Sequence, residues 1–298
     1  MLSIDPKSLE IPKLHQYLLG AIGPRPIAFA STIDKEGRSN LAPFSFFNVF
    51  SANPPIAIFS PARSGRTGIT KHTHENVLEV PEVVINVVNY EMVQQMSLAS
   101  SPYEKGVDEF VKAGFTKLKS EKIKPYRVAE SPVQLECVVK EVIELGKSGG
   151  AGNLIVSEVV MIHIQDQILN AAGGIDQQKI DLVARMGGNW YCRAHGEALF
   201  EIEKPITTLG IGVDTIPSRI KNSKILTGNN LGQLGNVENL PSEVEVLEFM
   251  EKENYKATMD EFSTNQEELD SWLHQRAQEL LAKNQVQEAW KLLLSVKY

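Results

Sequence analysis

The pattern of hydrophobic and polar positions changes about two thirds of the way along this 298-residue chain. Up to residue 169, short apolar runs rich in β-branched and aromatic residues alternate with turn residues, a pattern typical of strands. At least six strands joined mostly by turns predict a mainly β fold, a closed or nearly closed antiparallel barrel with peripheral helices, rather than a βαβ sheet. The predicted extended segments are 24–34, 40–50, 54–62, 82–90, 133–146 and 153–169.

Three details refine this prediction. Pro43 argues against an interior ladder position, because proline lacks a backbone donor. The near-continuous apolar run 82–90 predicts a strand that is buried on both faces. The glycine-rich "KSGGAG" at 147–152 lies between two strand patterns, so it predicts a hairpin turn rather than a phosphate loop.

The helical segments are fewer in the first part of the chain. Residues 6–20 start helical, and the polar loop 63–80 leads into a helix with Thr70 or Thr73 as the expected N-cap. One or two short helices are expected before Gly114. From Thr207 the chain is turn-rich and then helical over 242–255 and 263–298, with a turn of a helical hairpin at 283–285.

This change divides the chain into two predicted parts. Residues 1–206 form the barrel domain, and residues 207–298 form a C-terminal helical extension. In the last segment Leu269, Trp272, Leu273, Leu280 and Leu281 recur at three and four residues. We expect this tail to serve as a packing or dimer surface, since one helix pair is not a repeat array.

Composition narrows the class of protein. The net charge of −7 argues against a sequence-independent nucleic-acid binder, which needs a basic surface. Two distant cysteines make a disulfide scaffold or a cysteine-rich zinc site improbable. No signal peptide and no apolar run long enough for a membrane helix are evident, so a cytoplasmic protein without membrane association is expected.

Basic and hydroxyl residues concentrate between Ser60 and Asn76, just before a predicted helix start. Guanidinium and ammonium groups, hydroxyl donors and free N–H groups together suit a phosphate dianion, although a solvated surface loop has the same composition. His72 and His74 fall at a helix start, where i and i+2 point apart, so no metal site is expected. Motifs for acid–base hydrolysis are absent, and neither GxxxxGK[ST] nor GxGxxG occurs in this loop.

Several ordered motifs carry a family resemblance. The segment "GPRPIAFASTIDKEGRSNLAPFSFFNVFSANPPIAIFSPA", followed by "KHTHENVLEVPEVVINVV", resembles the flavin reductase-like, FMN-binding split-barrel family. The pattern is a first strand ending in Ser-Thr, a D-x-x-G turn, N-x-A-P-x-S-x-F-N, a Pro-Pro before the third strand, and T-x-x-N before V-V-x-N. The later "LVARMGGNWYCR" resembles the family's closing R-x-G-G-x-x-Y segment. The resemblance implies an antiparallel split β-barrel of Greek-key type.

The same resemblance implies which residues bind FMN non-covalently. Ser31 and Thr32 would lie near the ribityl-phosphate, and Ser45 to Asn48 would line the isoalloxazine. The phosphate would be held by Ser60, Arg63, Lys71, Thr73 and Asn76. The pocket would be completed by Arg185 and Tyr191, which in one version come from the dimer partner. The full implied set is Ser31, Thr32, Ser45, Phe46, Phe47, Asn48, Ser60, Arg63, Lys71, Thr73, Asn76, Arg185 and Tyr191. Residues Phe44, Phe46, Phe47 and Phe50 are expected mainly as barrel or dimer core.

The activity implied by the resemblance is that of an NAD(P)H:flavin oxidoreductase, in which hydride passes from the nicotinamide to flavin N5. The protein would act as a homodimer and deliver electrons to a partner monooxygenase or another acceptor. Two alternatives stay open: a flavoredoxin-like electron-transfer protein with fixed FMN, and a non-catalytic flavin-binding or regulatory module. The family's K-D-T appears here as Lys71-His72-Thr73, which leaves the middle contact open.

Overall fold

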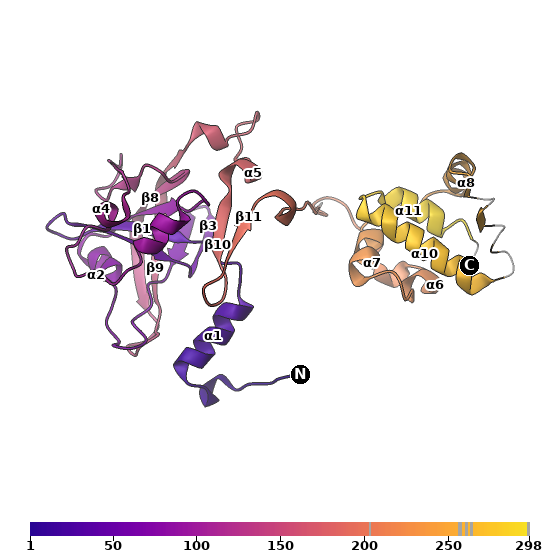
Figure 1. The fold of residues 1–298 in the computed structure, drawn as a ribbon. Coiled ribbons are helices and arrows are strands. Elements are labelled where there is room, and N and C mark those ends of the chain that lie inside the picture. The colour runs from indigo at the N-terminus through magenta and orange to yellow at the C-terminus, as the bar shows by residue number, and fades with distance from the viewer. Residues whose placement is uncertain (203, 256–257, 260–261, 263–264, 297–298) are drawn as a thin grey trace. The chain divides into compact units, whose positions relative to one another are not determined.

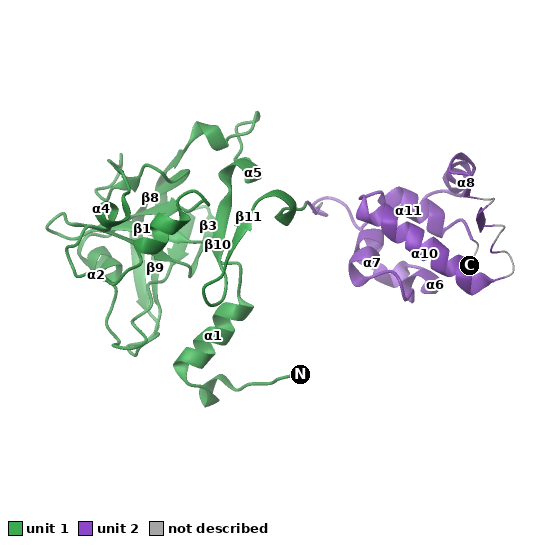
Figure 2. Cartoon of the chain, in the orientation of Figure 1, with its two compact units in different colours: residues 1–200 green, residues 201–298 purple. Residues whose placement is uncertain are grey.

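The computed structural model describes residues 1–298 except 203, 256–257, 260–261, 263–264 and 297–298. The chain divides into two units, residues 1–200 and residues 201–298, which Figure 2 colours green and purple. Within the described ranges, no helix combines the length and the apolar character that a membrane crossing requires.

Unit 1 is built on one seven-stranded antiparallel sheet, so the prediction of a mainly β, antiparallel fold is confirmed. Its strands follow the order β2-β1-β5-β8-β9-β4-β3 (Figure 1). One hydrophobic cluster, which includes Phe59, Ile85 and Ile155, packs on this sheet. The strands are β1 (Ala28–Ile33), β2 (Ser39–Phe44), β3 (Phe47–Ala52), β4 (Pro55–Phe59), β5 (Glu82–Val87), β8 (Val133–Glu144) and β9 (Asn153–Ile164).

The two edge strands of this sheet, β2 and β3, are neighbours along the chain. They form the predicted extended segment 40–50, which breaks at Ser45 and Phe46 into two strands instead of continuing as one. Pro43 lies opposite Phe29 on edge strand β2, as its missing donor predicts. We call residues Ser45 to Asn48, which form this connection and the start of β3, the seam of the sheet.

The central strands follow their apolar patterns. Residues 83–86 of β5 are all buried, which confirms the prediction for that strand. Strands β8 and β9 pair from Val133 opposite Ile164 to Glu144 opposite Asn153, so the glycine-rich segment is the turn of a hairpin, as predicted. Two small ribbons complete the β structure: β6 (Lys117–Leu118) with β7 (Arg127–Val128), and β10 (Leu182–Arg185) with β11 (Tyr191–Ala194).

Five helices surround the sheet of unit 1. Helix α2 packs against β1 and β2, whereas none of the residues of α1 is buried. The predicted N-cap of α2 is wrong: Lys71 holds that position without a side-chain cap, because the Thr70 hydroxyl donates to Glu75 and Thr73 lies inside the helix. The helices are α1 (Ile11–Ala21), α2 (His72–Glu79), α3 (Val93–Leu98), α4 (Glu109–Ala113) and α5 (Gln177–Ile180).

A buried guanidinium attaches α1 to the β10–β11 ribbon. Arg25 is 6% exposed, and it donates to the carbonyl oxygens of Leu19 (2.8 Å), Met186 (2.9 Å) and Ile22. Leu19 lies in the last turn of α1 and Ile22 is its C-cap, where carbonyl groups lack helical partners. Arg25 therefore satisfies the end of the helix and fixes its position beside the ribbon.

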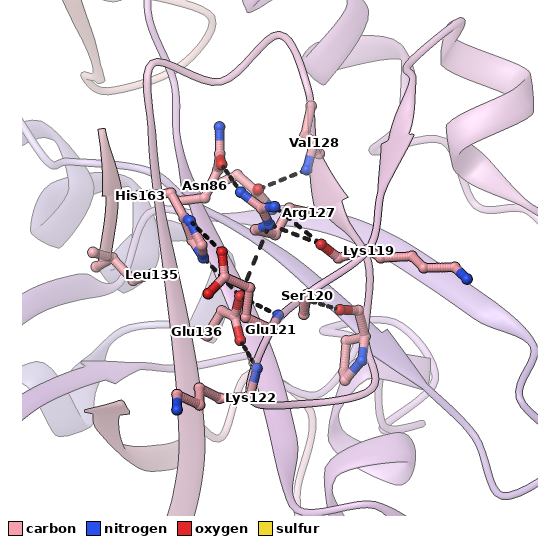
Figure 3. A network of polar contacts seen from close by, with 12 residues as sticks. Asn86, Lys119, Ser120, Glu121, Lys122, Arg127, Val128, Leu135, Glu136 and His163 are labelled. Carbon is pink, nitrogen blue, oxygen red and sulfur yellow. Dashed lines mark hydrogen bonds and ion pairs between the residues drawn. The ribbon is translucent and has the colours of Figure 1, made fainter. Parts of the chain in front are cut away.

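A buried carboxylate on β8 holds the loop around residues 121–122 (Figure 3). Glu136, on β8, has no exposed surface and accepts from the backbone N–H groups of Glu121 (2.8 Å) and Lys122 (2.7 Å). His163 Nε2 lies 2.7 Å from the same carboxylate. Burial by itself raises the pKa of Glu136, but these three donors outweigh it and lower that pKa below its ordinary value.

Unit 2 is helical, and its core surrounds Trp290. The indole is fully buried and donates to the carbonyl oxygen of Leu234 (3.0 Å). The helical hairpin predicted around 283–285 is confirmed over the described residues, with Asn284 in the left-handed region; residues 263–264 and 297–298 of that prediction lie outside them. The helices are α6 (Ser218–Lys221), α7 (Gly228–Gly235), α8 (Glu243–Lys252), α10 (Gln266–Ala282) and α11 (Val286–Leu293).

The substitution Glu136→Gln tests the role of the buried carboxylate. A glutamine retains one acceptor oxygen for three donors, so we expect the free energy of unfolding of unit 1 to fall by about 1–3 kcal/mol at neutral pH. Folding lowers the pKa of Glu136, so its ionised carboxylate stabilises the fold in full above the unfolded pKa of about 4.3. This stabilisation is lost as the pH falls through the folded pKa.

Urea unfolding at a series of pH values measures this difference. The difference between native chain and variant should shrink on acidification below about pH 4. Glu141→Gln, on the exposed face of the same strand, is the matched control and should change little. A difference that stays constant down to the lowest pH would show that the charge of Glu136 does not stabilise the fold.

Candidate functional site

The end of strand β1 and the first turns of α2 share a buried polar network. Asn76 Nδ2 donates to Thr32 Oγ1 (3.1 Å), and Asn40 Nδ2 donates to Thr73 Oγ1 (2.9 Å). Thr32, Thr73 and Asn76 are each at most 3% exposed. The structure thus brings these three candidate residues together: Asn76 bonds directly to Thr32, and Thr73 is linked to Thr32 through Asn40, whose Nδ2 lies 3.4 Å from Thr32 Oγ1.

A second set of hydrogen bonds joins the end of β4 to the seam and to the β8–β9 hairpin. The Ser60 N–H donates to the carbonyl oxygen of Phe46 (2.8 Å), and Ser60 Oγ accepts from the N–H of Asn153 (3.0 Å). Three residues on, the Arg63 N–H donates to the carbonyl oxygen of Ala151 (2.8 Å). Ser60 and Arg63 are therefore fixed by backbone contacts to two separate parts of the sheet.

The hairpin turn needs its glycines because it packs closely on this loop. A Cβ atom at Gly149 would lie 2.9 Å from the carbonyl oxygen of Ser64, and one at Gly152 would lie 2.8 Å from Ser60 Oγ. Real Cβ atoms do not approach so near to other heavy atoms. The glycine-rich turn therefore packs directly against the loop that follows Ser60.

Two cationic or potentially cationic groups converge beside this loop. Arg63 Nη2 lies 3.4 Å from one oxygen of Glu144, and His74 Nε2 lies 3.4 Å from the other. His74 is 3% exposed, and burial lowers its pKa; Glu144 opposes that shift and Arg63 adds to it. Burial therefore favours the neutral form of His74, in which one ring nitrogen is a donor and the other an acceptor.

Helix α2 begins next to these groups, and its N-terminus has no side-chain cap. Its N-cap, Lys71, is exposed and gives no side-chain cap to the first N–H groups. Thr70 and Glu75 are paired with each other through a 3.1 Å hydrogen bond. The first turn of an α-helix presents free N–H groups and partial positive charge, which favours an anion.

The seam carries the candidate residues for a flavin ring. Ser45 and Phe47 are half-buried, while Asn48 is exposed and its Oδ1 accepts from the next N–H along the chain (2.8 Å). Phe46 is 40% exposed, and its ring lies edge-on to His15 of α1, with centroids 6.3 Å apart. The Phe46–Ser60 bond described above places this seam beside the phosphate candidates.

The four phenylalanines around the seam divide between core and surface. Phe44 and Phe47 pack on the core cluster of the sheet, and the Phe44 ring lies 5.6 Å from that of Phe59. Phe46 and Phe50 are 40% and 64% exposed. Half of the expected core aromatics are thus in the core, and the other two present apolar surface to solvent.

Arg185 and Tyr191 lie on the separate β10–β11 ribbon. They are directly paired, and the guanidinium carbon of Arg185 is 4.6 Å from the Tyr191 ring centroid. The backbone of Arg185 exchanges two hydrogen bonds with Arg25, both 2.9 Å long, just before β1. The ribbon is therefore attached to the start of β1, whereas Ser31 and Thr32 lie near the end of that strand.

Several buried polar atoms at this site have no hydrogen-bond partner within the described residues. They include Arg63 Nε, both ring nitrogens of His74 and the Ser31 hydroxyl. Buried polar groups are normally satisfied, so unpaired donors next to an uncapped helix start suit an added acceptor group. The residues present thus fit the phosphate of a flavin mononucleotide on the Arg63–His74 side of the site.

The sequence-based set omitted some residues of this arrangement. Asn40, Glu144 and Asn153 are missing from it, although each bonds or pairs with a candidate residue. His74 was considered only as half of a metal motif. Only the strand register places Glu144 and Asn153 beside the Ser60–Arg63 loop, and no local spacing in the sequence signals that contact.

Comparison with known proteins places this geometry in a family. A family model described as a flavin reductase like domain matches residues 21–178, which is more than half of the chain. An uncharacterized protein of Halalkalibacterium halodurans is 36% identical over 206 residues, a match that covers 68% of this chain and 97% of the relative.

Two solved structures resemble unit 1 in fold and sequence. Nitrilotriacetate monooxygenase component B from Bacillus cereus has 31% identity and a TM-score of 0.63, covering 68% of this chain and 98% of that one. A putative flavin reductase with a split barrel domain from Shewanella frigidimarina has 26% identity and a TM-score of 0.56, covering 67% and 96%.

These matches confirm the split-barrel prediction. Buried donors that suit a flavin phosphate, an aromatic seam beside them and the family match lead to one conclusion. The chain belongs to the flavin reductase-like family and is a flavin-related redox protein.

Proposed function

We propose that this protein binds FMN non-covalently and acts as an NAD(P)H-dependent oxidoreductase that passes electrons to a partner or acceptor. The observation that carries the proposal is the set of unpaired buried donors of Arg63 and His74 beside the uncapped start of α2. The loop that carries Arg63 starts at Ser60, whose N–H donates to the carbonyl oxygen of Phe46 in the aromatic seam.

The phosphate end of FMN would be held by charge and backbone donors. Arg63 and Lys71 supply positive charge, and the first N–H groups of α2 add free donors. Ser60 acts by holding the loop in place, since its hydroxyl already accepts from Asn153. The start of α2 is held against β1 and β2 by the buried hydrogen bonds of Thr32, Thr73 and Asn76.

The ring end of FMN would lie along the seam. Residues Ser45 to Asn48 would border the isoalloxazine, with backbone N–H groups and Asn48 directed to its polar edge. Bound FMN supplies the redox chemistry itself, as a hydride acceptor and electron carrier. The chain would contribute binding, orientation and hydrogen bonds that stabilise negative charge on the ring, which needs no acid–base pair.

A partner monooxygenase is the proposed acceptor of the electrons. Its support is the resemblance to the structure of nitrilotriacetate monooxygenase component B. A flavin reductase of this kind would use NADH or NADPH as the electron donor.

We further propose that the working unit is a homodimer formed around strand β3. Val49 and Phe50 on this edge strand are 60% and 64% exposed, and edge strands leave unpaired backbone groups that another chain can cover. Helix α1 also buries none of its residues, with Leu18 53% exposed. Arg185 and Tyr191 would then complete the flavin pocket of the second copy.

Titration of the purified chain with FMN tests the binding proposal. The double variant Arg63→Ala/Lys71→Ala should weaken FMN binding by at least about a hundredfold, because each of the two charge-assisted contacts contributes about 1.5–3 kcal/mol. Quenching of flavin fluorescence measures the affinity, and circular dichroism checks that the fold is retained. The matched control Lys35→Ala/Lys119→Ala removes two exposed lysines elsewhere and should bind FMN like the native chain.

A native chain that fails to bind FMN would contradict the proposal outright. If the native chain binds and the Arg63/Lys71 variant binds equally well, FMN binds, but its phosphate lies elsewhere.

Sedimentation of the native chain and of Phe50→Asp tests the dimer. A buried charge without a partner is costly, so the substitution should raise the dimer dissociation constant by about a hundredfold. Leu98→Asp places the same charge on a helix surface that is 47% exposed, and it should leave the dimer intact. A native chain that sediments as a monomer at all concentrations would rule the dimer out.

A further inference from the structure

Helix α8 of unit 2 has two apolar faces, of which only one is used inside the unit. Val246 and Met250 are 8% exposed and belong to the core cluster around Trp290. On the adjoining side of the helix, Val244 and Leu247 are 63% and 64% exposed. Two large apolar side chains are therefore left in water on one short helix.

These exposed side chains form a stripe with regular spacing. Val244 and Leu247 are three residues apart, which puts them on the same face of a helix. Leu240, which precedes the N-cap Ser242 and lies outside the helix, is 42% exposed as well. Scattered single apolar residues on a surface need no explanation, but a stripe at helical spacing is the pattern of a docking face.

The direction of this stripe is fixed by the start of the helix. Ser242 and Glu245 form a reciprocal capping box: the Ser242 side chain accepts from the Glu245 N–H, and the Glu245 carboxylate accepts from the Ser242 N–H (2.8 Å). The adjoining face is held by the buried Val246 and Met250. Rotation of α8 to bury the stripe would expose those core residues.

Negative charge flanks the stripe. Glu248 and Glu251 follow Val244 and Leu247 by four residues each, so they lie on the same side of the helix and are exposed. The wider unit is acidic as well, since residues 201–298 contain 16 acidic and 10 basic residues, a net charge of −6 out of −7 for the chain. A partner that covers this face must carry positive charge near its apolar side chains.

The same charge argues against two other kinds of partner. A nucleic acid and an anionic membrane surface are both negative, so both are repelled by this face. A polypeptide segment with leucine-like residues at helical spacing and flanking Lys or Arg complements it in shape and charge.

We infer that the exposed face of α8, formed by Val244, Leu247, Glu248 and Glu251, docks a basic amphipathic helix of a partner protein. The surface belongs to residues outside the family match, which ends at residue 178. It therefore adds a binding activity to the redox domain and does not depend on whether that domain binds FMN.

A defined peptide tests the inference. The probe is a fluorescent peptide of about fourteen residues, four helical turns, made of Leu and Lys so that Leu recurs at three and four residues. Fluorescence anisotropy measures its binding to the full chain. The scrambled peptide has the same composition and charge without the apolar face, and a third peptide carries Glu in place of Lys.

The ordered basic peptide should bind, and the scrambled and acidic peptides should bind at least about tenfold more weakly. Leu247→Ser should weaken the binding by about tenfold, while Val111→Ser, an equally exposed apolar residue on α4, should have no effect. Glu248→Gln should weaken it and make it less sensitive to salt, whereas Glu141→Gln in unit 1 should not.

Three results would overturn the inference. Equal binding of the scrambled peptide would mean that charge alone attracts the probe. Equal affinities of the Leu247→Ser and Val111→Ser variants would place the binding elsewhere on the chain. A change in the sedimentation of the chain alone on Leu247→Ser would show that a second copy covers this face.

Discussion

The arrangement of the candidate site depends on the two hydrogen bonds of Ser60. Its backbone N–H holds the seam through Phe46, and its hydroxyl holds the β8–β9 hairpin through Asn153. The bond to Asn153 is buried, where a lost partner costs more than in water. Because Ser60 directly follows β4, these bonds set where the Arg63 loop begins relative to the aromatic seam. The loop, the hairpin glycines and the seam therefore form one rigid unit.

The chemistry of the site follows from what this rigid unit presents. It gathers donors and positive charge on one side and aromatic and amide groups on the other, and the sequence offers no acid–base pair for hydrolysis. Such a site suits a cofactor that carries its own reactivity, since the protein then has only to bind and orient it. A flavin reductase and a flavoredoxin-like carrier share this requirement, and they differ in whether a nicotinamide nucleotide reduces the flavin.

Much of the fold could be predicted from the sequence, because local patterns determine it. The apolar run of β5, the glycine turn between β8 and β9 and the hairpin of unit 2 all follow from periodicity and turn residues. The N-cap of α2 was predicted wrongly, because Thr70 and Thr73 found partners in Glu75 and Asn40. Such competition between partners depends on tertiary contacts that local spacing does not reveal.

The candidate site was only partly accessible from the sequence for the same reason. Residues Ser60 and Arg63 stand in a recognisable motif, whereas Glu144 and His74 reach the site through strand register and helix packing. Phe46 and Phe50 look like core residues in the sequence but are exposed, a distinction that only the position of β3 at the edge of the sheet makes.

The central claim is that a nicotinamide nucleotide reduces a flavin held by this barrel. Anaerobic titration of the FMN-loaded chain with NADH, and separately with NADPH, tests it by following the visible absorbance of the bound flavin. The account predicts that at least one of the two nucleotides bleaches the flavin stoichiometrically and that added free acceptor restores the colour. Bound flavin that keeps its full absorbance with both nucleotides, yet is bleached by dithionite, would contradict the reductase and favour a simple electron carrier.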